Sequence, residues 1–384
     1  MNQKEIGEIR RHLRRDRSNM TAIYGCYVNP QKTILSQFRL STGTMSENEG
    51  DRYFGFMKKI LSGGVGRNLI DIGFSTQQVM EGQEHKLLMG LRESKLADEE
   101  LLAQFYGKII DTVESEDNYL ILIGCDAYDV PFKNKNDEDD GDRAEETYRY
   151  LLCGICPVKD SKPNLTYDSE EKVFHDGAIR QQLAPPTVGF LFPSFDDRTT
   201  NIYHAQLYTR DTGDNHETLV KALFNTDPVM AAKDQKQAFE ALLERSLDDE
   251  CSMEVVQAVQ TELTQLMAMH KESKVADPLL ISKDQVEAVL TAKGVSEEKI
   301  SKFSVEYDDT FGFEAELHPW NVVDQKHFQV KTPDVTINVA PESSHLVQTR
   351  IIDGMKYILI AADDNVEVNG VNVNIADERV PAQV

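Results

Sequence analysis

Residues 118–131 read NYLILIGCDAYDVP, and the apolar run within this stretch, residues 119–123, is unbroken. A run of this length between turn-forming residues is typical of a strand that is buried on both faces of a sheet. The stretches TYRYLLCGICPV (147–158) and VGFLFPSF (188–195) have the same character. We therefore predict that these three strands lie near one another in a central sheet.

Helices and further strands surround these runs, without the strict strand–helix alternation of a doubly wound sheet. Ser46, with Glu49 three residues later, fits a capping box at the start of one helix, and Gly63 and Gly64 follow its end. The hydrophobic periodicity predicts helices over 4–17, 46–61, 77–95 and 98–113, and strands over 20–28, 32–40 and 201–209.

The second half of the chain changes character twice. Residues 216–271 show only helical periodicity, and residues 282–304 predict two short helices before a series of short strands. Asp353-Gly354 and Asn369-Gly370 are strong hairpin signals between these strands. The predicted fold class is α+β. It consists of a mixed α/β domain with a central sheet over 1–215, a helical connector over 216–276, and a small α+β domain over 277–384 that ends in antiparallel strands.

The composition of the chain narrows the cellular compartment and the classes of binding partner that we expect. Of the 384 residues 40% are hydrophobic and 28% are charged, and the formal net charge of −24 repels nucleic acid and anionic membranes at long range. No stretch has the roughly 20 apolar residues of a membrane-spanning helix, and the charged start lacks the apolar segment of a signal peptide. With only five cysteines, we expect a cytoplasmic protein with reduced thiols and no membrane partner. The acidic run 136–146 predicts a mobile loop.

Cys153 and Cys156 have the spacing of thiol–disulfide sites and of half a zinc site. Pro157 follows directly, and the neighbouring residues favour a strand, in which residues i and i+3 point to opposite faces. We therefore expect two buried thiols that act as small hydrophobic side chains. The sequence predicts neither a metal site nor a cofactor.

Acidic residues follow two of the buried strands. Asp126 and Asp129 come after the first strand, and Asp196 and Asp197 come after VGFLFPSF, with His204 beyond them. Carboxylates that converge at strand ends hold Mg²⁺ or perform acid–base chemistry in many hydrolases. The alternative is that Asp is simply favoured in turns, where it caps local N–H groups. A metal-assisted hydrolase is the enzymatic hypothesis that these residues permit.

Arginines near the start stand out in so acidic a chain. Arg10, Arg11, Arg14 and Arg15 could contact phosphates, as in an RNA- or ribosome-associated protein. The alternative is a face of internal salt bridges to the protein's own carboxylates. Arg67 lies in a glycine-rich stretch that resembles a phosphate loop but follows a helix, so helix termination is the favoured interpretation and anion binding stays open.

Several motifs together resemble an uncharacterised bacterial domain-of-unknown-function family of full-length proteins. The resemblance covers most of the chain and rests on EIRR near the start, GCYV (25–28), LRESKL (91–96), NYLILIGCDAYDVP, YLLCGICPV, GFLFPSFDDR and TRIIDGMKYILI (349–360). It implies a bacterial cytoplasmic protein. Because the family has no assigned activity, the resemblance assigns no catalytic residue.

No G-x-S-x-G, H-E-x-x-H or G-x-G-x-x-G motif occurs in the sequence. The sequence thus favours a non-enzymatic intracellular interaction protein with a protein partner. The metal-assisted hydrolase and the RNA- or ribosome-associated factor remain as two alternatives.

Overall fold

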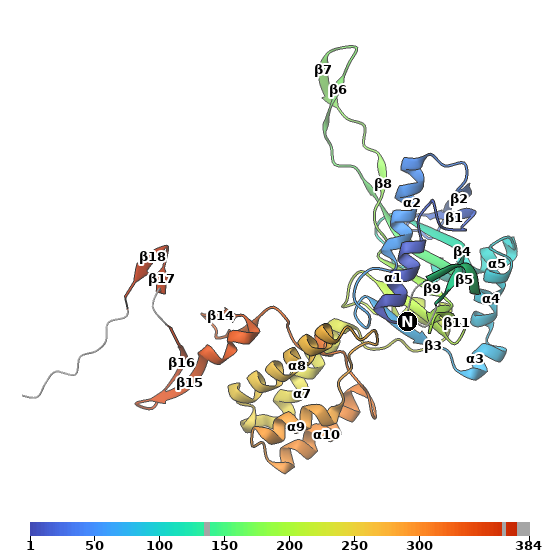
Figure 1. Cartoon of the computed structure of the whole chain (residues 1–384). Coiled ribbons are helices and arrows are strands. Elements are labelled where there is room, and N and C mark those ends of the chain that lie inside the picture. The colour runs from blue at the N-terminus through green and yellow to red at the C-terminus, as the bar shows by residue number, and fades with distance from the viewer. Residues whose placement is uncertain (134–138, 363–365, 375–384) are drawn as a thin grey trace, which may run out of the picture. The chain divides into compact units, whose positions relative to one another are not determined.

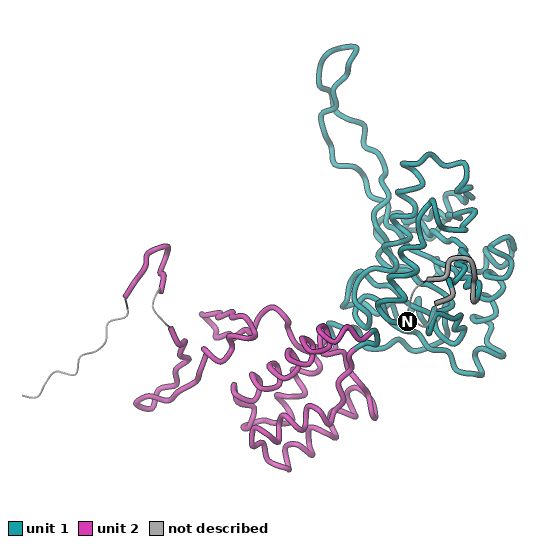
Figure 2. Tube along the Cα trace, viewed as in Figure 1, with its two compact units in different colours: residues 1–234, 276–278 teal, residues 235–275, 279–384 magenta. Residues whose placement is uncertain are grey.

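The computed structural model describes residues 1–133, 139–362 and 366–374 (Figure 1). The chain divides into two compact units, of which unit 1 comprises Met1–Asp234 with Ala276–Pro278, and unit 2 comprises Gln235–Val275 with Leu279–Val384 (Figure 2). No helix among the described residues is both long enough and apolar enough to cross a membrane.

Unit 1 is built on an eight-stranded sheet with the order β2-β1-β4-β5-β9-β12-β3, in which β8 also pairs with β5. All neighbouring strands are antiparallel. The strands are β1 (Ala22–Val28), β2 (Ile34–Ser41), β3 (Leu69–Gly73), β4 (Tyr119–Lys133), β5 (Asp139–Asp160), β8 (Gln181–Leu183), β9 (Val188–Phe192) and β12 (His204–Thr209). Strand β5 lies between β4 and β9, so the predicted proximity of the three buried strands is confirmed.

Helices cover both faces of the sheet (Figure 1). One hydrophobic cluster joins Leu120 and Leu122 of β4 to α1 (Gln3–His12) and α2 (Glu47–Lys59). The other joins Ile121 and Ile123 to α4 (Gln83–Glu93), α5 (Glu99–Thr112) and α6 (Glu217–Phe224). Because successive strand residues point to opposite faces, the unbroken apolar run of β4 supplies both clusters. The α+β fold class is confirmed.

Helix α1 is shorter than predicted. It begins after Asn2, whose side chain caps it in a box with Glu5, and it ends at His12. Leu13 leaves the helical conformation at φ −66° and ψ 66°, and residues 14–17 form a turn, so the helix predicted over 4–17 is wrong beyond His12. The tertiary contacts described below draw the chain back onto the sheet at this point.

The single helix predicted over 77–95 is also wrong, since the structure has two helices here. The first, α3 (Thr76–Glu81), ends at Gly82, which takes an extended conformation at ψ 132° before α4 begins. A Cβ at Gly82 would lie 2.5 Å from the carbonyl oxygen of Gln78, so only glycine permits this close approach.

The acidic run also differs from the prediction. Residues 136–138 lie outside the described residues, but residues 139–146 belong to β5 and pair with β4, for example Val130 with Glu146. The loop prediction is therefore wrong for this part, because the neighbouring strand supplies the backbone hydrogen bonds that local composition does not reveal.

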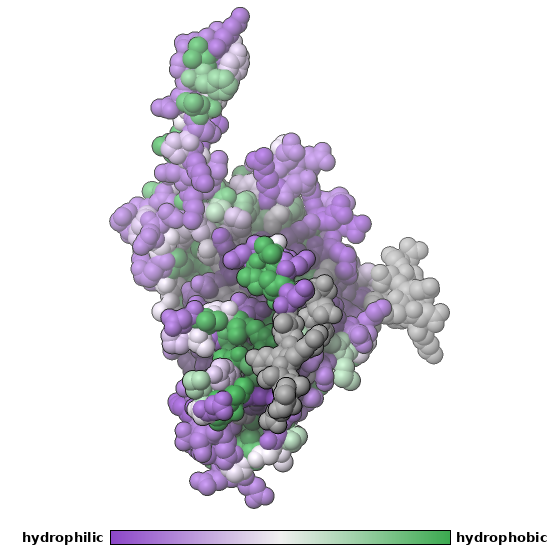
Figure 3. Space-filling model, turned by 90° about the vertical axis from the view of Figure 1, so that its left-hand side faces the viewer, coloured by the Kyte–Doolittle hydropathy of each residue, from purple (hydrophilic) through white to green (hydrophobic). Residues whose placement is uncertain are grey.

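A hairpin arm, residues 161–180, projects from the sheet between β5 and β8 (Figure 1). It contains β6 (Leu165–Asp168) and β7 (Val173–Asp176), which pair with each other. Leu165, Tyr167 and Phe174 are 66%, 52% and 60% exposed, and Figure 3 shows apolar residues among hydrophilic ones along this projection.

The described residues of unit 2 form a helical core and three separate strand pairs. The helices α7 (Ala232–Leu247), α8 (Met253–Ser273), α9 (Lys283–Ala292), α10 (Glu297–Phe311) and α11 (Pro319–Val322) contribute to one hydrophobic cluster. The pairs are β13 (Phe328–Lys331) with β14 (Thr336–Val339), β15 (Val347–Ile352) with β16 (Met355–Ile360), and β17 (Val366–Val368) with β18 (Val371–Val373). Both predicted turns are confirmed, with positive φ at Asp353-Gly354 and Asn369-Gly370. The division of the chain at residues 215 and 276 stays a prediction.

Candidate functional site

Asp126 is a buried residue that connects several segments on the α1 side of unit 1. Its side chain is buried, and it accepts hydrogen bonds from the hydroxyls of Ser18 (2.8 Å) and Tyr150 (2.9 Å) and from the backbone N–H of Ala127 (2.8 Å). His12 Nε2 lies 3.3 Å from the same carboxylate. These contacts tie the end of α1 and the following turn to the sheet, and they occupy the oxygens that a metal ion would need.

The other predicted carboxylates also have local partners. Asp129 accepts a hydrogen bond from Thr147 Oγ1 across the β4–β5 pair at 2.8 Å. Asp196 accepts one from Asn201 Nδ2 at 2.7 Å and forms an ion pair with the amino group of Met1 at 2.5 Å. None of these contacts is a cap on a local turn N–H, and Asp129 lies within β4, so the turn-capping interpretation stays a prediction for these two aspartates.

Asp197 and His204 lie in different surroundings. Asp197 has φ +49° in the turn between β10 (Ser194–Asp196) and β11 (Thr199–Asn201). His204 is on β12 and forms a 2.6 Å contact with Asp71 of β3. Over the parts of the chain that the structure describes, no group of three or more His, Cys, Asp or Glu side chains could hold a metal ion. The catalytic role of these residues stays a prediction.

Cys153 and Cys156 lie on opposite faces of β5. Cys153 belongs to the cluster under α4 and α5, and Cys156 belongs to the cluster under α1 and α2. Burial raises the pKa of Cys156 to about 12 and the pKa of Cys153 well above its usual value. The predicted burial on opposite faces is therefore confirmed, and neither thiol is an available nucleophile at neutral pH.

The arginines lie on α1 and in the turn that follows it. Arg10 and Arg11 are exposed on α1, and neither forms an ion pair or a side-chain hydrogen bond with any residue that the structure describes. Arg14 pairs with Asp16 at 3.2 Å. Arg15 donates a hydrogen bond to the carbonyl of Met45 at 3.3 Å, which places it over the start of α2.

Lys58 of α2 adds a cation from a distant part of the sequence. Burial lowers the pKa of Lys58, and the positive charges of Arg14 and Arg10 lower it further, against the opposing effect of Asp51 and Asp16. The turn after α1 and the end of α2 therefore lie close enough for their charges to interact, and both arginines and carboxylates act on Lys58. We call the cations that are exposed or partly exposed on these two segments the basic surface; they are Arg10, Arg11, Arg14, Arg15, Arg17 and Lys58.

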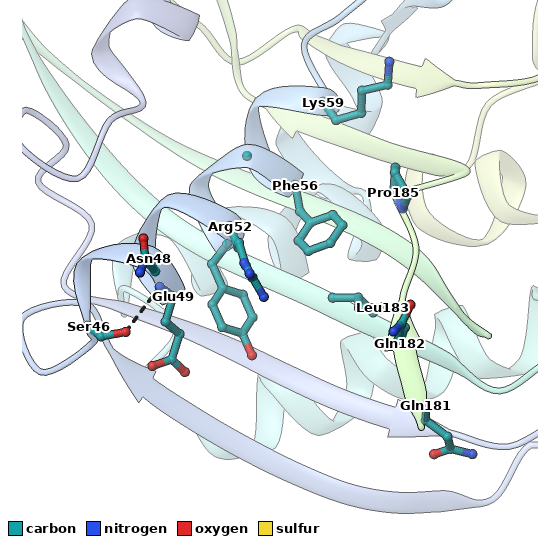
Figure 4. A pocket seen from close by; sticks show the side chains of 12 residues that line it. Ser46, Asn48, Glu49, Arg52, Phe56, Lys59, Gln181, Gln182, Leu183 and Pro185 are labelled. Carbon is teal, nitrogen blue, oxygen red and sulfur yellow. Dashed lines mark hydrogen bonds between the residues drawn. The ribbon is translucent and has the colours of Figure 1, made fainter. Parts of the chain in front are cut away.

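A groove with a volume of about 870 Å³ lies on the other flank of α2, between this helix and the β8 segment (Figure 4). Helix α2 contributes the rings of Tyr53 and Phe56 and the cations Arg52 and Lys59. The sequence interpretation missed this groove. On α2 the sequence does carry a signal, because the basic and aromatic residues Arg52, Tyr53, Phe56 and Lys59 recur at helical spacing. The β8 residues that face them come more than 100 positions later.

Arg67 is exposed in the turn that follows α2. Gly63 has φ +104° in this turn, and Asn68 Nδ2 donates a hydrogen bond to the carbonyl of Thr209 at 3.0 Å. The segment thus ends α2 and leads into β3, as the helix-termination interpretation predicts. Anion binding by Arg67 stays a prediction.

Unit 1 is thus an α+β domain with an antiparallel sheet between two helical layers, and α2 lies between the basic surface on one flank and the aromatic groove on the other. The chain matches the family described as a domain of unknown function (DUF4317) over residues 1–371, and it belongs to this family. The resemblance seen in the motifs is therefore confirmed. No curated protein and no solved structure matches the chain.

Proposed function

We propose that this protein binds RNA through the basic surface of unit 1. The observation that carries the proposal is a set of cations that form no direct ion pair. Arg10, Arg11 and Lys58 form no ion pair with a described residue, although the whole chain carries a charge of −24. If these residues only balanced internal acids, the surplus of carboxylates should have supplied partners.

Arginine is well suited to this role because its guanidinium group donates bidentate hydrogen bonds to phosphate oxygens. The cations come from two segments and form an extended surface, which matches the repeated charges of a phosphodiester backbone. The proposal includes a bacterial cytoplasmic location, which the five free cysteines support, since thiols stay reduced in that compartment.

The test measures the affinity of the full chain for a labelled single-stranded RNA of about 20 nucleotides by fluorescence anisotropy, between about 50 and 200 mM salt. We expect the logarithm of the association constant to fall linearly with the logarithm of the salt concentration. Replacing Arg10 and Lys58 together by Gln should weaken binding and reduce the slope by about 1.4, since each phosphate contact of a single strand contributes about 0.7.

The matched control is Lys86→Gln, which removes an exposed cation from α4 on the opposite face of the sheet. It should leave the affinity and the slope unchanged. No RNA binding at the lowest salt concentration, where phosphate contacts are strongest, would overturn the proposal.

A second candidate function is docking of a protein partner through the hairpin arm. The exposed Leu165, Tyr167 and Phe174 favour it, because a two-stranded ribbon cannot cover its own apolar face. The test compares proteins that co-purify with the unmodified chain and with a Tyr167→Ser, Phe174→Ser variant. A partner retained equally by both chains counts against docking at the arm.

A further inference from the structure

The groove beside α2 has the chemistry of a site for an unpaired nucleobase. We infer that it takes one unpaired base of a bound RNA, so that the protein prefers single strands to duplexes. This inference rests on the proposed function, because the basic surface supplies the phosphate contacts. The groove volume of about 870 Å³ falls within the range of roughly 300–1,000 Å³ that is usual for small-ligand pockets.

The aromatic rings of the groove are held in place from below. Tyr53 and Phe56 lie one turn apart on α2, and both pack against the hydrophobic cluster under this helix while remaining partly exposed. Leu183 of β8 packs against the same cluster from the facing side. Rings fixed in this way offer a ready stacking surface, because binding then costs less side-chain entropy than it would with a mobile ring.

The charges of the groove give the bound nucleotide a direction. Glu49 lies at one end of the α2 side and Lys59 at the other, with Arg52 between them (Figure 4). Burial raises the pKa of Tyr53, and the carboxylate of Glu49 raises it further, so this phenol stays protonated. A phosphate is repelled by Glu49 and attracted by Lys59, which places the sugar–phosphate backbone at the Lys59 end.

Polar groups on the β8 side could contact the edge of a base. Gln181 accepts a hydrogen bond from the hydroxyl of Tyr27 at 2.6 Å and is thereby fixed. The exposed side-chain amide of Gln182 forms no hydrogen bond with a described residue, so both its donor and its acceptor are available. A base in a duplex presents neither a free face for stacking nor a free Watson–Crick edge, which excludes duplex RNA from this groove.

The groove is continuous with the proposed phosphate-binding surface through α2 itself. Lys58 and Lys59 are neighbours in sequence but lie on different flanks of the helix, one near Arg14 and the other at the groove. A strand that passes from the basic surface to the groove needs to cross only the width of one helix, about 10 Å.

The experiment compares the affinities of the full chain for a single-stranded RNA and for a duplex of the same length at one salt concentration. The variants are Tyr53→Leu and Phe56→Leu, which keep an apolar side chain against the cluster but remove the ring. Each should weaken single-strand binding about tenfold, the effect expected for one stacked base, and leave duplex binding unchanged.

Two controls separate loss of the ring from loss of structure. Phe56→Tyr keeps an aromatic ring and should retain the affinity, and Tyr203→Leu removes a ring that is exposed outside the groove and should have no effect. Equal binding of single strand and duplex, or unchanged single-strand affinity in both leucine variants, overturns the inference but leaves the proposed function intact. If neither RNA binds at low salt, both the proposed function and this inference are wrong.

Discussion

Asp126 shows how one side chain can fix the course of a whole segment. The residue is 1% exposed, and its carboxylate accepts hydrogen bonds from Ser18, more than 100 residues earlier, and from Tyr150 on the neighbouring strand. Burial of a carboxylate is unfavourable unless its oxygens are hydrogen-bonded, and here they are. The turn that carries Arg14, Arg15 and Arg17 begins beside this anchor.

We predict that Asp126→Asn lowers the free energy of unfolding of unit 1 by about 1–3 kcal/mol, because the new amide places donors opposite the hydroxyls of Ser18 and Tyr150. Urea unfolding followed by circular dichroism measures the change. Asp129→Asn is the matched control, since the one hydrogen bond that exposed Asp129 is seen to form with a described residue goes to Thr147, and it should change stability by less than about 0.5 kcal/mol. Equal losses in the two variants would contradict the anchoring role of Asp126.

The buried thiols should react slowly in the folded protein. Because burial raises the pKa of Cys156 to about 12 and that of Cys26 to about 11, almost no thiolate forms at pH 8 in the folded protein. A thiol reagent such as Ellman's reagent should therefore modify Cys26, Cys153 and Cys156 only after denaturation. Rapid modification of all five cysteines in the native protein would show that the sheet opens readily.

Among the elements, α3 and α4 depend on the one residue that separates them. Replacing Gly82 by Ala should destabilise unit 1 by about 1–3 kcal/mol, because the added Cβ would collide with the carbonyl of Gln78. Gly107 on α5 is the matched comparison, since an added Cβ meets nothing within 4 Å, and Gly107→Ala should stabilise by about 0.5–1 kcal/mol. Thermal unfolding of both variants checks the opposite signs.

The hairpin arm should be the first site of proteolysis in the free protein. Two strands without further neighbours are marginally stable, and Lys172 lies at φ +56° between β6 and β7, where trypsin can reach it. We expect limited trypsin digestion to cut at Lys172 before it degrades the sheet, as read by mass spectrometry. If trypsin does not cut the arm in the isolated chain, another part of the same chain must cover Lys172.

The elements that the sequence predicts well are those decided by local pattern. The apolar run of β4 and the Asp-Gly and Asn-Gly turns of unit 2 carry their own signals, and the structure contains all of them. The end of α1 and the start of β5 were missed because a distant carboxylate and a neighbouring strand decide them. The groove was missed for the same reason, since β8 is far from α2 in sequence and nothing in either segment alone indicates that they face each other.

For the whole molecule, the charge of −24 opposes compactness through repulsion between carboxylates. Salt screens this repulsion, with a Debye length that falls from roughly 30 Å at 0.01 M to about 10 Å at 0.1 M. We therefore predict that the apparent melting temperature rises when sodium chloride is added over this range. A fall in melting temperature would mean that attractive ion pairs outweigh the net repulsion.

The order of strands in the sheet also has a consequence for synthesis on the ribosome. Among the strands that the structure describes, β3 pairs only with β12, and the partners Gly73 and His204 are about 130 residues apart in sequence. At roughly 5–20 residues per second, the ribosome adds that length in about 7–26 s. During this interval the apolar residues of β3 have no strand to pair with, so the nascent chain is most exposed to aggregation, or most dependent on a chaperone, before β12 emerges.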